Sequence, residues 1–383
     1  MAFLDLFVQF PIVSPFAREI GATPGFAGLI VAAYSFSNLF GNVAAGVLLD
    51  RWGRILPLRA GMLLTSLALF GYVASDSPEQ LLIARTIHGL SAAILAPGAF
   101  AIIGDLSSHK SRLRVMGRSS ASIALAAVVG PMSAGLVSSA AGYRAAFLLT
   151  ASLMLLVFLL FSLSPRAKLE SRSQNVSDTP NGPDPHRADY SLLTISYAAA
   201  LAMTVGIGAL VTSLPTWVLA QGKQEHWIGI LFAVWAAVGM VVMASSLLDL
   251  PMHRGRWAPL ATGMGLIGIG LGAVGAIPGT LGSIVGMVLF GGGFGLTYPR
   301  LISMVVDATS EGKRGRALGV FYAVYSLGVA IGAVSSGLLE DGFGSSSPAP
   351  FFLGMVIVAV ALPVTFIVDS VGRTRTKTND VPV

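Results

Sequence analysis

Hydrophobic positions in this chain form long unbroken runs rather than the alternating pattern of a half-buried strand. A helix needs about 20 apolar residues to cross a bilayer, whereas a membrane barrel shows alternation over about ten residues per strand. Twelve runs fit the helical alternative, and they cover approximately residues 2–18, 26–49, 55–75, 80–104, 116–140, 144–164, 191–220, 227–250, 256–276, 280–306, 315–339 and 350–370. The pattern predicts an all-α integral membrane protein with twelve transmembrane helices.

One long polar segment, residues 165–190, separates the sixth run from the seventh. It is rich in Pro, Ser, Asn and charged residues, a composition typical of a flexible linker. We therefore predict an N-terminal six-helix bundle over residues 1–164, a cytoplasmic linker over 165–190, a second six-helix bundle over 191–371 and a cytoplasmic tail over 372–383. Met1 lies almost inside the first run, so we expect the natural first helix to begin upstream of it.

The distribution of positive charge predicts how the chain sits in its membrane. Most of the 24 lysines and arginines lie in the loops after even-numbered helices and in the tail. Cytoplasmic loops carry such an excess, so both termini and the linker are expected in the cytoplasm. We expect the membrane to be a bacterial inner (plasma) membrane and the protein to be a monomer.

Composition narrows the function. Only 11% of the 383 residues are Asp, Glu, Lys or Arg, compared with about 25% in soluble domains. This excludes an ordinary soluble enzyme, a disordered protein and a nucleic-acid-binding module. The chain has no cysteine, which excludes disulfides and thiolate metal sites. No motif for catalysis or nucleotide binding is found, so we expect no enzymatic activity, no cofactor, no metal and no nucleic-acid partner.

The two halves repeat at an offset of about 202 residues. Pro97 and Asp105 recur as Pro299 and Asp307. The Arg-x-x-Gly spacing of residues 114–117 recurs at 316–319. Because six helices return the chain to the same side, the halves are parallel repeats about a pseudo-twofold axis along the membrane normal, an arrangement found in major facilitator transporters.

The loop after the second run carries a specific motif. Residues 46–54 read GVLLDRWGR and resemble the G-x-L-x-D-R-x-G-R signature of the major facilitator superfamily, although Ile55 replaces the basic residue that usually follows. Gly46 would allow close helix packing, and Gly53 would permit a tight turn. The resemblance implies a cytoplasmic gate, to which we assign Gly46, Asp50, Arg51, Gly53, Arg54, Asp105, Arg112 and Arg114.

The fourth run contains charges inside a membrane span. Arg85, His88 and Gly89 match the family pattern R-x-x-Q-G, with His in place of Gln. A buried arginine is costly and usually faces a cavity or a partner. We therefore treat Arg85 and His88 as proton-coupling candidates. The alternatives are that Arg85 extends to the membrane interface and that His88 is a packed, satisfied core histidine.

Gly130, Pro131 and Gly135 in the fifth run resemble the G-P-x-x-G-G element that this family associates with exporters and antiporters. Ala134 replaces the first of the paired glycines. Plain helix packing beside a proline kink is the alternative explanation.

Asp5 is the best candidate for binding a proton. A carboxylate in a low-dielectric cavity is favoured in its neutral form, so it can load and release a proton. The drug–proton antiporters of the superfamily often carry an acid at this place. An acid at the membrane interface is the alternative.

Further residues are candidates for lining a substrate cavity. Tyr34 and Asn38 are four residues apart on one helical face, and Arg300 follows a proline inside the tenth run. Arg300 either lines the cavity or extends to the interface, and the aromatic candidates are more often packing residues. The full set is Gln9, Tyr34, Asn38, Arg85, Trp217, Trp235, Tyr298, Arg300, Tyr322 and Tyr325.

The chain as a whole resembles the twelve-helix drug–proton antiporters. This resemblance implies a secondary active transporter that works by alternating access and exports a small apolar or amphipathic compound in exchange for protons. Uptake or efflux of a metabolite or sugar, and lipid flipping, are alternatives on the same fold. A membrane sensor or scaffold that does not transport is an alternative of another class.

Overall fold

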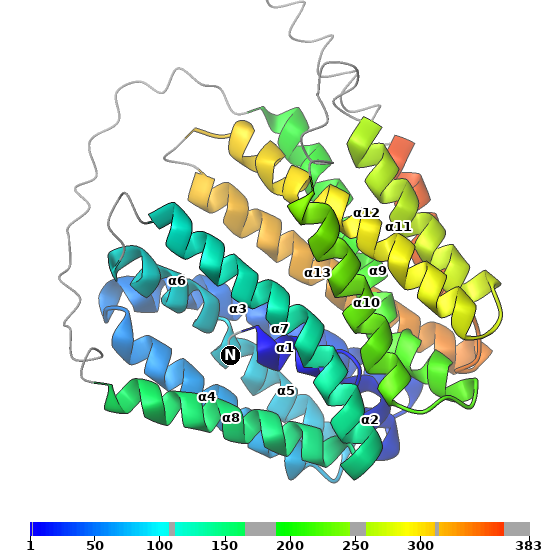
Figure 1. The fold of residues 1–383 in the computed structure, drawn as a ribbon, viewed down its shortest axis with the longest axis horizontal. Helices are drawn as coiled ribbons and strands as arrows, with labels where there is room; N and C mark the ends of the chain where they lie inside the picture. Colours follow the sequence, from blue (N-terminus) through cyan, green and yellow to red (C-terminus); the bar gives the residue numbers. More distant parts are fainter. Residues whose placement is uncertain (2, 107–111, 165–188, 246–257, 311–313, 364–383) are drawn as a thin grey trace, which may run out of the picture.

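The computed structural model describes residues 1, 3–106, 112–164, 189–245, 258–310 and 314–363. All regular elements within these ranges are helices (Figure 1). Those of the first half are α1 (Leu4–Gln9), α2 (Val13–Glu19), α3 (Pro24–Arg51), α4 (Ile55–Val73), α5 (Pro78–Ala92), α6 (Leu95–Leu106), α7 (Arg112–Ala141) and α8 (Tyr143–Leu163). Those of the second half are α9 (Tyr190–Ala220), α10 (His226–Ala244), α11 (Ala258–Ala276), α12 (Gly279–Asp307) and α13 (Arg314–Phe343), followed by a short apolar helix, Ala349–Pro363.

Ten of these helical segments are long and apolar enough to cross a membrane. Their bounds match the predicted runs, and their large apolar side chains are often exposed, as on α8 at Leu156, Leu160 and Leu163. An exposed apolar surface of this extent needs a lipid partner. The prediction of an all-α membrane protein is confirmed, and the predicted linker and tail lie almost entirely outside the described residues.

Two predicted spans are interrupted in the structure. The first run forms α1 and α2 with a break at Phe10–Ile12, and the fourth forms α5 and α6 with a break at Ala93–Ile94. A proline cannot donate its backbone hydrogen bond and its ring clashes with the preceding turn. Pro11 and Pro97 lie at or just after these breaks, so they account for the interruptions.

The two halves meet through a symmetric pair of contacts. α3 of the first half packs along α13 of the second, and α7 of the first packs along α10 of the second. The second span of each half is α3 or α10, and the fifth span is α7 or α13, so exchanging the halves converts one contact into the other. This is the relationship expected of two six-helix bundles about a pseudo-twofold axis.

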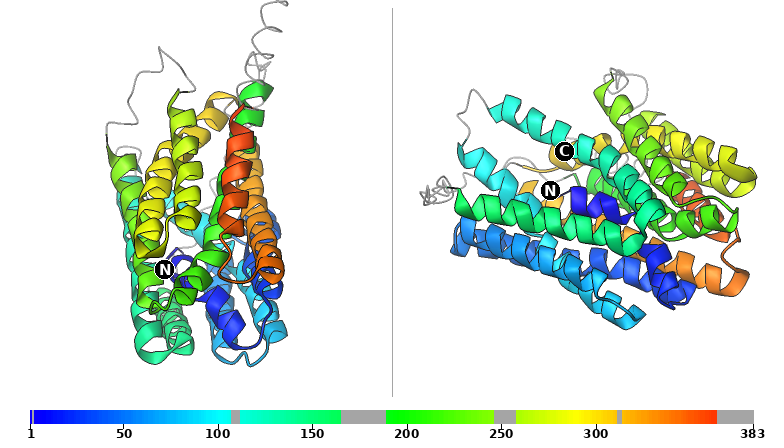
Figure 2. Two further views of the ribbon diagram at one scale, coloured as in Figure 1. Left: turned by 90° about the vertical axis from the view of Figure 1, so that its right-hand side faces the viewer. Right: turned by 60° about the horizontal axis from the view of Figure 1, so that its bottom comes forward.

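Figure 1 shows the first half at the lower left and the second half at the upper right. In the left view of Figure 2 the helices of both halves run in roughly the same direction, as membrane-spanning helices do. α1 packs against α7 in the interior of the first half. The packing therefore brings Asp5 and Gln9 of α1 inside the protein, where both are fully buried.

Candidate functional site

A buried polar cluster is built from four helices of the first half. Asp5 and Gln9 come from α1, Tyr72 from α4, and Arg85 and His88 from α5, and each is at most 2% exposed. The spacing of four residues on α1 and three on α5 places each pair on one helical face. Tyr34 of α3 completes the cluster at 8% exposure.

His88 lies at the centre of the polar cluster. Its Nε2 is 3.0 Å from Oδ2 of Asp5, and its Nδ1 is 2.9 Å from the Tyr72 hydroxyl. The Gln9 amide nitrogen is 3.3 Å from the same Nδ1. The imidazole is therefore contacted through both ring nitrogens and links α1 to α4.

Arg85 supplies the positive charge of the polar cluster. Its guanidinium donates to the Gln9 side-chain oxygen and to the Tyr72 hydroxyl at 3.2 Å. Its Cζ lies 4.8 Å from the centre of the Tyr34 ring, within the range of a cation–π interaction. Arg85 thus points into the protein interior, which disfavours the alternative of a side chain that extends to the interface.

Two buried atoms in the polar cluster have no hydrogen-bond partner among the described residues, Oδ1 of Asp5 and Nε of Arg85. A buried polar atom without a hydrogen-bond partner lowers the stability of the fold, and such atoms often mark a functional site. The free carboxylate oxygen is a position at which a proton can bind without displacing an existing hydrogen bond.

Of the other predicted cavity residues, Asn38 lies beside the polar cluster and donates to the carbonyl of Gly89 at 3.1 Å. Its amide therefore joins α3 to α5. Trp217 packs against Phe351 with ring centres 5.7 Å apart. Arg300 follows Tyr298 by two positions on α12, and residues at that spacing do not share a helical face.

A second cluster in the other half is aromatic. Tyr298 stacks on Phe294 at 5.2 Å, and Phe294 packs edge-on against Trp235 at 5.7 Å. Tyr325 packs against Tyr298, and the Tyr322 hydroxyl is 3.4 Å from that of Tyr298. Phe10, just after α1, stacks on Trp235 at 6.1 Å. This aromatic cluster of Trp235, Phe294, Tyr298, Tyr322 and Tyr325 is thereby joined to the helix that carries Asp5.

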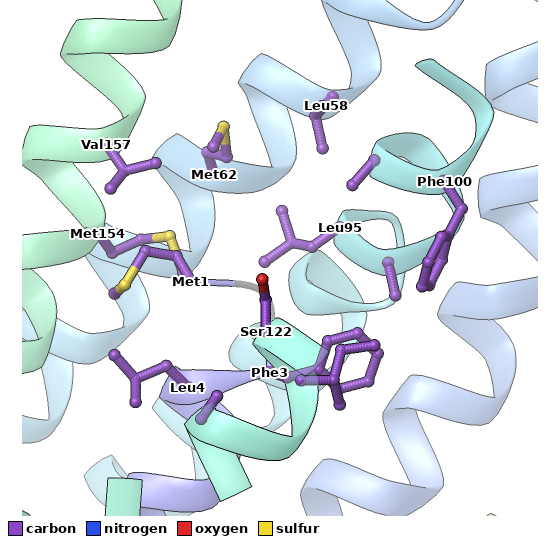
Figure 3. Close-up of a pocket in the computed structure, with 14 residues that line it drawn as sticks. Met1, Phe3, Leu4, Leu58, Met62, Leu95, Phe100, Ser122, Met154 and Val157 are labelled. Carbon is purple, nitrogen blue, oxygen red and sulfur yellow. The ribbon is translucent and has the colours of Figure 1, made fainter. Parts of the chain in front are cut away.

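The first half also contains an apolar cavity of about 320 Å³. Leu4 of α1, Met62 of α4, Ala99 of α6, Ala126 of α7 and Met154 of α8 are among its lining residues. Figure 3 shows Leu4, Met62 and Met154 around Met1, and the Ser122 hydroxyl as a polar group in the lining. A cavity of this size and character fits part of an apolar molecule.

The predicted gate loop is only partly described. Gly53 has a φ of +73°, so the tight turn expected there is confirmed, and Arg54 donates to the carbonyl of Leu49 at 3.4 Å. Arg51 is exposed. A Cβ placed on Gly46 would meet no described atom within 4 Å, so the close helix approach expected there is absent from this conformation, because no described neighbour packs on that side of α3.

The side chains of Asp50, Asp105, Arg112 and Arg114 lie outside the description. The proposed charge network at the gate therefore stays a prediction.

The glycines of the α7 motif lie at helix contacts. A Cβ on Gly130 would be 3.0 Å from Cβ of Phe7 on α1, and one on Gly135 would be 3.0 Å from Cα of Gly229 on α10. Pro131 lies within α7 and its carbonyl also faces Gly229. These contacts favour the packing explanation of the motif, and they place it where the two halves meet.

Polar contacts join the two halves at one end of the bundles. Arg18 of α2 pairs with Glu340 of α13 at 3.1 Å, and Thr216 of α9 donates to the same carboxylate at 3.2 Å. The backbone nitrogen of Gly25 at the start of α3 donates to Asp341 at 2.9 Å. Sequence analysis did not predict these contacts, because Arg18 and Glu340 both lie at the edges of apolar runs.

Comparison with known proteins places this architecture in a family. A family profile described as "Major Facilitator Superfamily" matches residues 1–333. The chain belongs to the major facilitator superfamily. Among solved structures of similar fold is a bacterial homologue of the human lysosomal transporter Spinster in an inward-facing, unoccupied conformation, with a TM-score of 0.80, 16% identity, and coverage of 100% of this chain and 96% of the other.

Curated relatives include proteins named for drug resistance. Multidrug resistance protein 1 of Bacillus subtilis is 30% identical over 166 residues, which are 43% of this chain and 42% of the relative. Quinolone resistance protein NorA of Staphylococcus aureus is 27% identical over 160 residues, 42% of this chain and 41% of the relative. The synaptic vesicular amine transporter of Homo sapiens is 23% identical over 83% of this chain and 62% of the relative. The matches thus span less than two thirds of each relative's length.

Proposed function

We propose that the protein is a monomeric secondary active transporter of a bacterial plasma membrane that exports a small apolar or amphipathic compound in exchange for protons. The observation that carries this proposal is the fully buried pair of Asp5 and His88, with Arg85 close by. Ionisable groups inside a membrane span are expensive and mark ion pathways or proton relays. A carboxylate with one unpartnered oxygen can alternate between its charged and neutral forms.

The names of the relatives support export as the direction of transport. The bacterial relatives are named for resistance to drugs and to quinolones, and the human relative for the transport of amines. Drugs, quinolones and amines are all small organic compounds, which is the substrate class proposed for this chain. Two of these matches cover less than half of this chain, so the proposal rests on the buried cluster in addition to the names.

The surfaces that a substrate could contact support an apolar or amphipathic compound as the substrate. The aromatic cluster offers ring faces, and the apolar cavity offers aliphatic and thioether surface. Such surfaces bind the apolar part of a compound, with few polar groups to fix its orientation. A sugar or a strongly charged metabolite would find few hydrogen-bond partners there.

Alternating access is supported by the contacts between the halves. Two contacts join the halves at one end, Arg18 with Glu340 and Gly25 with Asp341. If the charge distribution orients the protein as predicted, that end faces away from the cytoplasm. We infer a conformation closed on the outside, from which the substrate would be loaded from the cytoplasm.

A transport assay tests the proposal. The full chain is reconstituted into liposomes with a pH-sensitive dye inside, and a pH gradient is imposed in the presence of ethidium or other amphipathic fluorescent dyes. We expect ethidium movement against its gradient, coupled to proton flow. Asp5→Asn should abolish the coupling, whereas Asp76→Asn, which alters an exposed carboxylate, should not. Proton-driven transport that survives Asp5→Asn contradicts the proposed function.

A further inference from the structure

The hydrogen bonds around His88 determine which of its nitrogens carries a proton. Gln9 is the first constraint, because its side-chain oxygen accepts from Arg85, which can only donate. The other atom of the Gln9 amide is therefore the NH₂ group, which donates to the backbone oxygen of Asp5 at 2.7 Å and faces Nδ1 of His88 at 3.3 Å. An NH₂ group has no acceptor capacity, so Nδ1 must accept.

Tyr72 is the second group beside Nδ1. Its hydroxyl oxygen accepts from Arg85 at 3.2 Å and lies 2.9 Å from Nδ1 of His88 and 3.4 Å from the Gln9 side-chain oxygen. Because the Gln9 amide already requires Nδ1 to accept, the hydroxyl proton takes the shorter of these two contacts and is donated to Nδ1. Two donors thus converge on one nitrogen, which leaves no place for a proton on it. The imidazole must be neutral and carry its proton on Nε2.

This assignment gives Asp5 the acceptor role in its contact with His88. The Nε2 proton of His88 points at Oδ2 of Asp5, 3.0 Å away, and the carboxylate accepts it. The charged or titratable groups facing this pair are Arg85 from α5, Tyr34 from α3 and Tyr72 from α4. When Asp5 is ionised, its carboxylate balances the guanidinium of Arg85 and the polar cluster is neutral overall.

We propose that Tyr72 and Gln9 are positioning residues that keep His88 neutral, so that the proton carried during transport binds Oδ1 of Asp5 rather than the imidazole. The inference rests on the proposed function. A proton taken from the aqueous side onto Oδ1, which has no described partner, forms a carboxylic acid and breaks no hydrogen bond. A proton on Nδ1 would require two donors to turn away.

The binding of a proton to Asp5 has a further consequence. It leaves Arg85 as an uncompensated buried charge, and a charge without a partner is strongly destabilising in such surroundings. The protonated cluster therefore favours a rearrangement that rehydrates Arg85 or offers it another partner. His88 stays neutral with its proton on Nε2 in both states, and its two ring nitrogens keep Asp5 linked to Tyr72.

Nitrogen NMR of the full chain in liposomes tests the tautomer directly. Histidine is labelled with ¹⁵N, and the His88 signals are identified by their loss in His88→Asn. At neutral pH we expect one protonated nitrogen, Nε2, and one unprotonated nitrogen, Nδ1. A doubly protonated ring, or a proton on Nδ1, overturns the proposal.

The role of Tyr72 is tested by its phenylalanine variant. Tyr72→Phe removes one donor from Nδ1, and losing a hydrogen bond of ordinary strength should let His88 take up a proton at a pH about one unit higher. Tyr197→Phe is the matched control, because that hydroxyl donates to the carbonyl of Ala317 on α13. An unchanged His88 titration in a folded Tyr72→Phe protein contradicts the positioning role.

These outcomes are separable from those of the transport assay. If His88 has the expected tautomer but Asp5→Asn still couples dye movement to protons, the proposed function fails and the assignment of the tautomer stands. If coupling depends on Asp5 but His88 is protonated on Nδ1, the proposed function stands and the positioning role of Tyr72 and Gln9 fails.

Discussion

Arg18 and Glu340, which are 322 residues apart in the chain, form an ion pair that crosses from the first half to the second. Their side chains are 26% and 2% exposed, so the arginine reaches solvent while the carboxylate does not. Arg18 also donates to Ser345 at 2.7 Å. Next to this pair, Asp341 accepts from the first turn of α3, where an anion is favoured by the helix dipole. These contacts join the two halves at one end of the protein.

Removing the negative charge of Glu340 should open this end. Glu340→Gln leaves Arg18 without its carboxylate, so the contact between the halves is weakened. If the arrangement joined at this end loses about 1–2 kcal/mol of stability relative to the open one, the ratio of open to joined molecules rises by a factor of roughly 5–30. Because the chain has no natural cysteine, Thr212→Cys provides a single label at a position that is 2% exposed. We expect Glu340→Gln to raise the rate of maleimide labelling by roughly that factor.

Asp76 supplies the control for this experiment. It pairs with Arg144 at 2.6 Å, but both side chains belong to the first half and are 77% and 46% exposed. Such surface pairs contribute little, so Asp76→Asn should leave the labelling rate unchanged. Equal rates in the parent protein and Glu340→Gln would remove the ion pair from the closing mechanism.

Two glycines of α3 provide a matched test of the contact between the halves. A Cβ on Gly28 would collide with the carbonyl of Ala333 on α13, whereas one on Gly46 would meet no described atom within 4 Å. Overpacking costs about 1–3 kcal/mol, while an unhindered alanine gains roughly 0.5–1 kcal/mol over glycine in a helix. Gly28→Ala should therefore lower the thermal unfolding midpoint in detergent, and Gly46→Ala should hold or raise it.

The two substitutions also differ in their effect on conformation. Gly28→Ala disfavours the closed arrangement of α3 and α13, so it should increase labelling of Thr212→Cys, and Gly46→Ala should not. If the two variants behave alike in both measurements, the close contact at Gly28 does not stabilise this state.

Much of this architecture could be predicted from the sequence because membrane helices leave a strong signal. A span requires a long apolar run, and the bilayer permits few alternatives. The same constraint made Asp5 and Arg85 conspicuous, since charges inside a span are rare. Gln9, Tyr34 and His88 were also predicted as candidates, and the structure brings all five together.

The residues that sequence analysis missed have no comparable signal. Tyr72 lies in an apolar run, where a tyrosine most often serves packing, and only the fold brings its hydroxyl to His88. Arg18 and Glu340 lie at the ends of runs and resemble loop charges. Their pairing depends on how α2 and α13 approach each other, which spacing within either half does not encode.

Asp5 and Arg85 should be energetically coupled although Gln9 lies between them. Asp5→Asn leaves a buried cation and Arg85→Gln leaves a buried anion, and losing one partner of a buried pair costs about 3–5 kcal/mol. The double variant leaves neither charge. We expect it to be more stable than the sum of the single effects predicts, with a coupling of about 1–3 kcal/mol.

Thermal unfolding of the two single variants and the double variant in detergent measures this coupling. His88→Asn combined with Arg85→Gln serves as a comparison, because a neutral imidazole carries no charge for Arg85 to balance, and it should show weaker coupling than the Asp5 pair. Strictly additive effects of Asp5→Asn and Arg85→Gln would show that the guanidinium does not compensate the carboxylate.

Filling the apolar cavity should weaken the binding of an apolar ligand and leave the fold intact. Ala126 lines the cavity, and its replacement by leucine adds three carbons to a space of about 320 Å³. Each buried carbon contributes roughly 0.8 kcal/mol, so Ala126→Leu should preserve or raise stability without ligand. With N-phenyl-1-naphthylamine, an uncharged aromatic probe, binding should weaken by roughly tenfold or more, since 1.4 kcal/mol corresponds to a factor of ten.

Thermal unfolding followed by circular dichroism, at several probe concentrations, measures both the stability without ligand and the binding of the probe. Ala359→Leu makes the same change at an exposed position of the last helix and should alter neither, and a probe-induced shift that is the same in both variants would place the bound probe outside this cavity.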